Sequence, residues 1–171
     1  MSPTIHRLAL LGFGPVGRSF AEILSEKGDQ IEQRYGIRLR IVAAVDRTGG
    51  AVNEDGLDAA ALVAAKRSGS VSRYPECGRE GLTGDEILAD TSADTIFEAT
   101  SVNMTDGEPG MTYVRSALSA GRHVVMANKG PLVLAYQEMM GLAQQNRVAL
   151  KFSATRGGSM PTYNLGARDL A

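Results

Sequence analysis

Gly12-Phe13-Gly14-Pro15-Val16-Gly17 is the stretch that decides the fold of this chain, because its surroundings match a strand-to-helix turn. The apolar run Leu8 to Leu11 precedes it directly and has the composition of a buried parallel strand. Apolar residues at helical spacing follow it: Val16, Phe20, Ile23 and Leu24. A later apolar run, Leu39 to Val45, ends on Asp46. The order of strand, glycine turn, helix, strand and acidic residue predicts a dinucleotide-binding unit.

Each glycine of this turn has a separate physical role. Gly12 lets the chain leave the strand tightly, Gly14 leaves room for a pyrophosphate at the backbone, and Gly17 lets the helix pack against the sheet. Pro15 suits the first turn of a helix, where its missing N–H is not needed. The N–H groups and the positive dipole end of this helix would face the phosphates. We therefore expect all six residues to bind the cofactor, although a connection without a ligand can carry the same spacing.

Length and composition indicate one globular domain. A chain of 171 residues buries about 70% of the surface that it exposes when unfolded, and 43% hydrophobic with 22% charged residues is ordinary for an α/β protein. The net charge of −1 argues against nucleic acid or an anionic membrane as the main partner. The single cysteine, Cys77, excludes an internal disulfide and fits a reducing compartment. Since there is no long apolar run near the N-terminus, we expect a cytoplasmic protein.

The remainder of the chain alternates apolar strands with helices. Further strands are predicted at Thr95 to Ala99, His123 to Ala127 and Val148 to Phe152. Helical spacing predicts helices over 57–66, 84–89, 111–118 and from 131 onward, and a first helix that continues past Gly28. Asp46 to Gly50 is expected to be a loop, and residues 51–92 show no recognisable chemistry. The alternation predicts an α/β fold with a doubly wound, mostly parallel sheet of the Rossmann type.

The last residues have a different character. Thr155 to Pro161 is a glycine-rich loop, and Leu165 to Ala171 has the pattern of an opening helix. A chain that ends one turn into an element is typical of a fragment of a longer protein. We therefore expect residues 1–152 to form the nucleotide-binding domain, and residues 153–171 to form a hinge and the start of a second domain.

Ligands of open α/β sheets bind outside the carboxyl ends of the strands, near the switch in strand order. Six polar residues beyond the glycine turn are predicted there: Asp46, Arg47, Thr100, Ser101, Asn128 and Lys129. Asp46 can accept hydrogen bonds from the adenosine ribose, which favours NAD, whereas Arg47 can pair with the 2′-phosphate of NADP. Either side chain can instead be a solvated loop charge, so the sequence predicts NAD or NADP without choosing between them.

Lys129 is the candidate catalytic residue. It follows a buried strand and precedes a helix, which would bring its ammonium near the nicotinamide end of the groove. A lysine there can orient a carboxylate or hydroxyl, and partial desolvation would suit it to acid–base work, although an ordinary surface lysine has the same spacing. His6 and His123 are predicted to be structural, and Cys77 to be a loop thiol. One cysteine and two distant histidines cannot form a zinc site, so no metal is expected.

Four segments of the chain match one known family: the glycine turn, Glu98–Ser101, Gly121–Leu132 and Ser153–Pro161. Through them the chain resembles homoserine dehydrogenase over nearly its whole length, and Asp169 falls in the family's connection to its second domain. The match at Ala127-Asn128-Lys129 and the terminal glycine loop are quite specific, whereas many families share the glycine turn.

The resemblance implies an NAD(P)-dependent oxidoreductase that interconverts L-aspartate 4-semialdehyde and L-homoserine, in the pathway to threonine and methionine. It implies that Lys129 lies by the nicotinamide and the substrate, and that most of the substrate site and the dimer contacts lie in a catalytic and dimerisation domain beyond this chain. The family often has Glu at the position of Ser153 and an apolar residue at Arg156. That region contributes to a monovalent cation site in some members, so no metal is carried over.

We expect the chain alone to bind nucleotide and to turn over little or no substrate. A standalone NAD(P)-binding regulatory module is the alternative reading of the same sequence.

Overall fold

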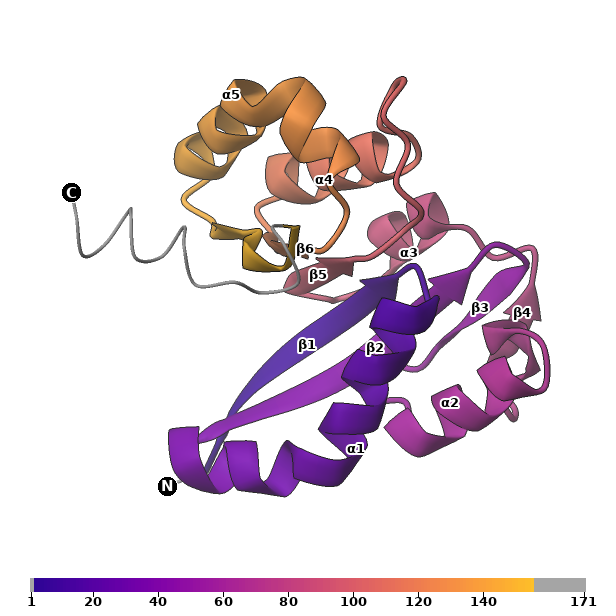
Figure 1. Cartoon of the computed structure of the whole chain (residues 1–171). Helices are drawn as coiled ribbons and strands as arrows, with labels where there is room; N and C mark the ends of the chain where they lie inside the picture. Colours follow the sequence, from indigo (N-terminus) through magenta and orange to yellow (C-terminus); the bar gives the residue numbers. More distant parts are fainter. Residues whose placement is uncertain (1, 156–171) are drawn as a thin grey trace.

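The computed structural model describes residues 2–155, which form one open sheet of seven strands with helices on both faces (Figure 1). The strands are β1 (Thr4–Leu11), β2 (Ile37–Asp46), β3 (Gly49–Val52), β4 (Gly78–Glu80), β5 (Thr95–Glu98), β6 (His123–Met126) and β7 (Leu150–Lys151). Their order in the sheet is β4-β3-β2-β1-β5-β6-β7, and β2, β1, β5, β6 and β7 run parallel. The strand order reverses at β1, so the predicted doubly wound, mostly parallel sheet is confirmed.

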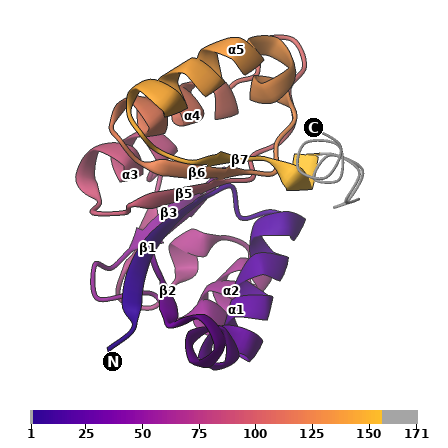
Figure 2. The ribbon, with the colours of Figure 1, turned by 90° about the vertical axis from the view of Figure 1, so that its left-hand side faces the viewer.

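Two layers of helices cover this sheet. They are α1 (Pro15–Tyr35), α2 (Ala59–Arg67), α3 (Gly84–Asp90), α4 (Gly110–Ser119) and α5 (Gly130–Gln145), with short 3-10 turns at Val71–Arg73 and Ser153–Thr155. Figure 2 shows α1 and α2 on one face of the sheet and α4 and α5 on the other. No helix within residues 2–155 is long and apolar enough to cross a membrane.

Strand β1 illustrates why the sheet is apolar on both faces. Its residues alternate between two clusters: Leu8 and Leu10 pack beneath α1 and α2, whereas Ala9 and Leu11 pack beneath α4 and α5. Side chains of a strand alternate between faces, so a strand covered on both sides must be apolar at nearly every position. This requirement explains the unbroken apolar run before the glycine turn.

The first helix continues past Gly28 as predicted and reaches Tyr35. Gly36 ends it in the left-handed conformation, at φ 66°, and donates its N–H to the carbonyl of Glu32 at 2.8 Å. The predicted helices over 57–66, 84–89 and 111–118 correspond to α2, α3 and α4. The predicted strand Val148 to Phe152 is shorter in the structure, where β7 spans Leu150–Lys151.

The prediction of a loop from Asp46 to Gly50 is wrong at both ends. Asp46 is the last residue of β2, and Gly49–Val52 is an antiparallel strand, β3, that pairs with β2. The two glycines serve close approach here: a Cβ on Gly49 would lie 2.3 Å from the carbonyl oxygen of Arg79, and one on Gly50 would lie 2.4 Å from that of Ala44. Strand β4, which pairs with β3, was also not predicted.

Most of the predicted second unit, residues 153–171, lies outside the described residues. Only Ser153–Thr155 of that unit is described, as a 3-10 turn. The glycine-rich loop beyond Thr155, the departure at Arg156 and the match at Asp169 therefore belong to the part of the chain that the structure does not describe.

A matched pair of glycine substitutions tests the β2–β3 pairing. Gly50→Ala forces a methyl against the Ala44 carbonyl and should lower the free energy of unfolding by about 1–3 kcal/mol. Gly141→Ala at an exposed position of α5, where nothing lies within 4 Å of the added Cβ, should raise it by about 0.5–1 kcal/mol. Urea unfolding of the two variants measures both changes. Equal effects of the two substitutions would contradict the pairing.

Candidate functional site

Gly12 stands where three parallel strands end. Its φ of 96° is a left-handed value, and its N–H donates to the carbonyl of Val45 at 3.0 Å. A Cβ at this position would lie 2.4 Å from the carbonyl oxygen of Ala99. Side-chain-bearing residues rarely adopt this conformation, and none would fit the space, so only glycine lets β1 turn into α1 between β2 and β5.

The other two glycines of the turn differ from each other in what surrounds them. A Cβ on Gly17 would lie 2.4 Å from the carbonyl oxygen of Gly12, so α1 packs directly onto the turn. Gly14 is the N-cap of α1 and has no atom within 4 Å of a Cβ position. It gives the helix no side-chain cap, and the first turn carries no acidic residue. The N-terminal N–H groups of α1 are therefore available to an anion at an open surface.

A groove of about 680 Å³ runs over this turn along the carboxyl ends of β1, β2 and β5. Its lining residues are Gly12, Phe13, Gly14, Pro15, Val16, Val45, Asp46, Arg47, Lys66, Gly81, Leu82, Thr83, Gly84, Ala99, Thr100, Ser101, Pro109 and Tyr113. The groove brings together nine of the predicted cofactor residues. Of these, Phe13 is buried in the core and offers a ligand little accessible surface. Gly17 lies behind the turn and lines no part of the groove.

The two remaining predicted residues lie beside the groove. Asn128 is buried at the end of β6, where its Nδ2 donates to the hydroxyl of Thr100 at 3.1 Å. Lys129 is exposed at the N-cap of α5 and lines a second cavity, of about 340 Å³, with Leu132, Val133, Tyr136 and Thr155. Within residues 2–155, Lys129 therefore remains in contact with solvent.

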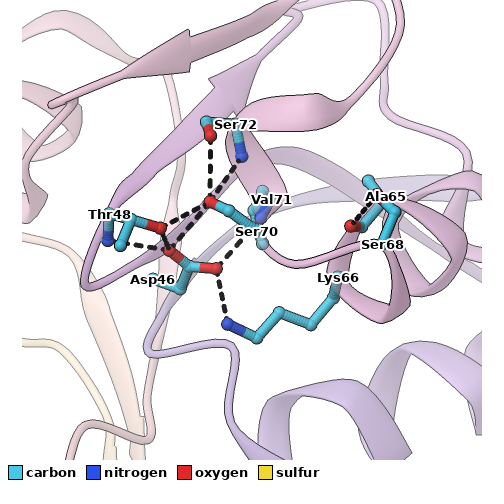
Figure 3. A network of polar contacts seen from close by, with 8 residues as sticks. All are labelled: Asp46, Thr48, Ala65, Lys66, Ser68, Ser70, Val71 and Ser72. Carbon is cyan, nitrogen blue, oxygen red and sulfur yellow. Dashed lines mark hydrogen bonds and ion pairs between the residues drawn. The ribbon is translucent and has the colours of Figure 1, made fainter.

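The carboxylate of Asp46 is enclosed by donors of its own chain (Figure 3). Its Oδ1 accepts from the N–H and hydroxyl of Thr48, at 2.9 and 2.8 Å, and from the hydroxyl of Ser70 at 3.1 Å. Its Oδ2 accepts from Lys66 Nζ at 2.6 Å and from the N–H of Val71 at 3.0 Å. The side chain is only 6% exposed. A carboxylate has about four acceptor positions, so these donors occupy it fully, and a ribose hydroxyl would have to displace one of them.

This enclosure sets the ionisation of Asp46. Burial by itself raises the pKa of the carboxyl, but the hydrogen bonds from Lys66, Thr48 and Val71 outweigh it and hold the pKa well below its ordinary value. Asp46 is therefore a fixed anion that ties the end of β2 to α2 and to the 3-10 turn after it.

Two cations lie at this end of the groove. The side chain of Arg47 is exposed and makes no hydrogen bond or ion pair with the rest of residues 2–155. Lys66 is paired with Asp46 while still lining the groove. Sequence reasoning missed Lys66, together with the stretch Gly81–Gly84, because residues 51–92 were expected to hold no chemistry. The local sequence could have indicated Lys66, which is one of two basic residues in the last turn of an alanine-rich helix, but it gives no indication of Gly81–Gly84.

The histidines and the cysteine lie away from the groove. His123 Nδ1 accepts from the N–H of Ala149 at 2.9 Å, His6 Nδ1 lies 3.9 Å from a carboxylate oxygen of Asp94, and Cys77 packs against the apolar cluster beneath α1 and α2. Among the described residues, no group of three or more His, Cys, Asp or Glu side chains could hold a metal ion.

The pH dependence of stability tests the Asp46 contacts. Asp46→Asn should lower the free energy of unfolding by roughly 2 kcal/mol at pH 7, because it removes the charged acceptor. The folded-state pKa lies below the unfolded one, so the contribution is present above about pH 4 and is lost as the pH falls further toward the folded value. Urea unfolding at several pH values should show the two proteins converging below pH 4.

Asp90→Asn is the matched control, because Asp90 is exposed and its side chain has no hydrogen bond or ion pair with other described residues. It should shift stability little at any pH. If the free energies of unfolding of Asp46→Asn and the parent protein differ by the same amount down to pH 3, the lowered pKa assigned to Asp46 is wrong.

Comparison with known proteins agrees with this geometry. Residues 12–153 match the family model described as the NAD-binding domain of homoserine dehydrogenase. The chain is 35% identical over 165 residues to a homoserine dehydrogenase of Methanocaldococcus jannaschii, and 37% identical over 170 residues to an NAD(+)-dependent homoserine dehydrogenase of Pseudomonas canavaninivorans. These matches cover 96% and 98% of this chain and 48% of each relative. The chain thus spans about half the length of these curated relatives.

Solved structures show the same relationship. A crystal structure from Archaeoglobus fulgidus, provisionally named a homoserine dehydrogenase, superposes with a TM-score of 0.82 at 32% identity and covers 97% of this chain and 48% of that one. A hyperthermophilic archaeal homoserine dehydrogenase in complex with NADPH gives a TM-score of 0.77 at 25% identity and covers 89% of this chain and 44% of that one. The chain belongs to the homoserine dehydrogenase family and corresponds to the NAD(P)-binding portion of its members.

Proposed function

We propose that this groove holds the nicotinamide cofactor of a homoserine dehydrogenase, which in its intact form interconverts L-aspartate 4-semialdehyde and L-homoserine. The observation that carries the proposal is the open space above Gly14, at the uncapped N-terminus of α1. A pyrophosphate at this position would accept hydrogen bonds from the backbone and lie in the positive field of the helix end.

The chemistry divides between the cofactor and the chain. When bound, the cofactor supplies or accepts the hydride. The residues of the chain bind and orient: the glycine turn and the N-terminus of α1 hold the phosphates, and Thr100 and Ser101 border the groove where β5 ends. Hydride transfer depends on holding donor and acceptor in line, which is the contribution expected of such a scaffold.

Lys129 is the residue that we propose to position the substrate. It lines the cavity of about 340 Å³ that adjoins the start of α5, and its ammonium is free to meet a carboxylate or hydroxyl there. The remaining walls of this cavity within residues 2–155 are mostly apolar, which leaves Lys129 as its cationic group. In the intact enzyme we propose that the rest of the substrate site and any dimer contacts come from the remaining half, and that the protein is cytoplasmic.

We further propose that the groove prefers NADP over NAD. Asp46 is occupied by donors of its own chain, which removes the acceptor that favours an unphosphorylated ribose. Arg47 and Lys66 line the same end, and both can donate to a 2′-phosphate. The curated relative from P. canavaninivorans is NAD(+)-dependent, so the preference is a property to be measured in this chain.

Substitution of Arg47 tests that preference. Arg47→Ala should weaken NADPH binding roughly ten- to a hundredfold, because a charge-assisted pair with the 2′-phosphate is lost, and should change NADH binding little. Arg34→Ala is the control, since Arg34 lies in the last turn of α1, far from the phosphate end of that helix. Tighter binding of NADH than NADPH by the parent chain, or an equal loss for both, would refute the proposal.

Titration with NADPH and NADH, followed by nicotinamide fluorescence, tests the binding site itself. The chain contains no tryptophan to interfere. We expect saturable binding by the parent chain and none by Gly14→Val. Since a Cβ on Gly14 meets no atom within 4 Å, the variant should still fold, with a urea midpoint somewhat below that of the parent because valine is a poorer N-cap than glycine. Undiminished binding by a folded Gly14→Val protein would exclude the groove as the site.

A further inference from the structure

A buried acid lies beneath the groove without lining it. Glu98 is the last residue of β5 and is fully buried. Its Oε1 accepts from the N–H of Thr100 at 2.9 Å, from the Thr100 hydroxyl, and more distantly from Asn128 Nδ2 at 3.4 Å. These contacts join the ends of β5 and β6, which are followed by the predicted residues Thr100, Ser101, Asn128 and Lys129.

Asn128 extends these contacts across Lys129. Its Oδ1 accepts from the N–H of Gly130 at 2.9 Å, so the side chain bridges from the end of β6 to the first residue of α5. Its Nδ2 bonds the Thr100 hydroxyl at 3.1 Å in addition to the longer contact with Glu98. The Asn128 side chain therefore links the residue before Lys129 to the residue after it. Thr100 and Glu98, at the end of β5, hold that side chain in place.

The cluster is closed from above by the start of α4. A Cβ on Gly110 would lie 2.6 Å from Asn128 Nδ2 and 3.0 Å from Glu98 Oε1, so the backbone of the helix rests on both side chains. The second carboxyl oxygen, Oε2, is buried without a hydrogen-bond partner in the described part of the chain. Burial raises the pKa of the Glu98 carboxyl, and the hydrogen bonds from Thr100 and Asn128 oppose this rise.

We propose that Glu98 is a positioning residue for the nicotinamide half of the groove: through Asn128 and Thr100 it fixes the backbone around Lys129 relative to the end of β5. This inference rests on the proposed function. Glu98 itself touches no ligand, because it lies below the groove and not in its wall. Glu98 acts on the positions of Thr100 and Asn128.

The phosphate half of the groove is held by different contacts. Gly12 donates to Val45, and Ala99 donates to the Leu11 carbonyl at 2.8 Å, so the glycine turn is tied to β2 and β5 through backbone bonds that do not involve the Glu98 carboxyl. Removing that carboxyl should therefore disturb the nicotinamide half selectively. A ligand that ends at the pyrophosphate should not sense the change.

The test compares NADPH with ADP on the same variants. Glu98→Ala should weaken NADPH binding roughly three- to tenfold, while ADP affinity stays within twofold of the parent. Glu98→Gln keeps the acceptor at Oε1 and should restore NADPH affinity. The emission of NADPH bound at saturation should also change in Glu98→Ala and recover in Glu98→Gln, which a general loss of stability would not produce. Glu54→Ala is the matched control, since Glu54 is an exposed glutamate that is hydrogen-bonded to Ser92.

Asn128→Ala removes the bridge directly and should reproduce the selective loss, which keeps the test open if Glu98→Ala does not fold. A parent chain that binds neither ligand would refute the proposed function. A parent chain that binds both, with variants that bind both equally well or lose both in parallel, would overturn only the positioning role of Glu98. Failure of Glu98→Gln to restore binding would overturn it as well.

Discussion

The close backbone approach at Gly12 is the constraint on which the rest of the structure depends. The carbonyl of Ala99 stands where a Cβ of Gly12 would be, and the carbonyl of Gly12 stands where a Cβ of Gly17 would be. These two contacts set the first helix against the ends of three parallel strands and leave the backbone at Gly14 open. Because backbone atoms pack closely at Gly12 and Gly17 while the space around Gly14 is open, the N–H groups of the helix can meet an anion without an intervening side chain.

One carboxyl group lines the groove and another lies beneath it, and their surroundings shift their pKa values in opposite directions. Asp46 ends β2 and is enclosed by a lysine, two hydroxyls and two backbone N–H groups, so its pKa is lowered. Glu98 ends β5 with fewer donors and deeper burial, so its pKa is raised. Asp46 joins the end of β2 to Lys66 of α2, and Glu98 joins the end of β5 to Asn128, which is bonded to the start of α5.

Much of this arrangement could be predicted from local patterns. The glycine turn, the long first helix and the alternation of strands and helices follow from residues close together in the sequence. The hairpin of β3 and β4 could not be predicted, because Gly49 and Gly50 are typical of loops, and their role in close approach appears only when Arg79 and Ala44 face them. The partners of Asp46 were missed for the same reason, since Lys66 lies twenty residues further along the chain. Glu98 was part of a recognised segment, yet its burial depends on α4 folding over it.

The N-terminus of α1 and the end of β1 are proposed to form the phosphate-binding wall of one nucleotide groove, which continues past Thr100 and Ser101 at the end of β5. The most direct measurement is a two-dimensional ¹⁵N NMR titration of the chain with NADPH. We expect the amides of Gly14, Val16 and Gly17, together with those of Thr100 and Ser101, to shift most and to saturate together. Saturable binding that leaves these amides unmoved, while others shift, would contradict this proposal.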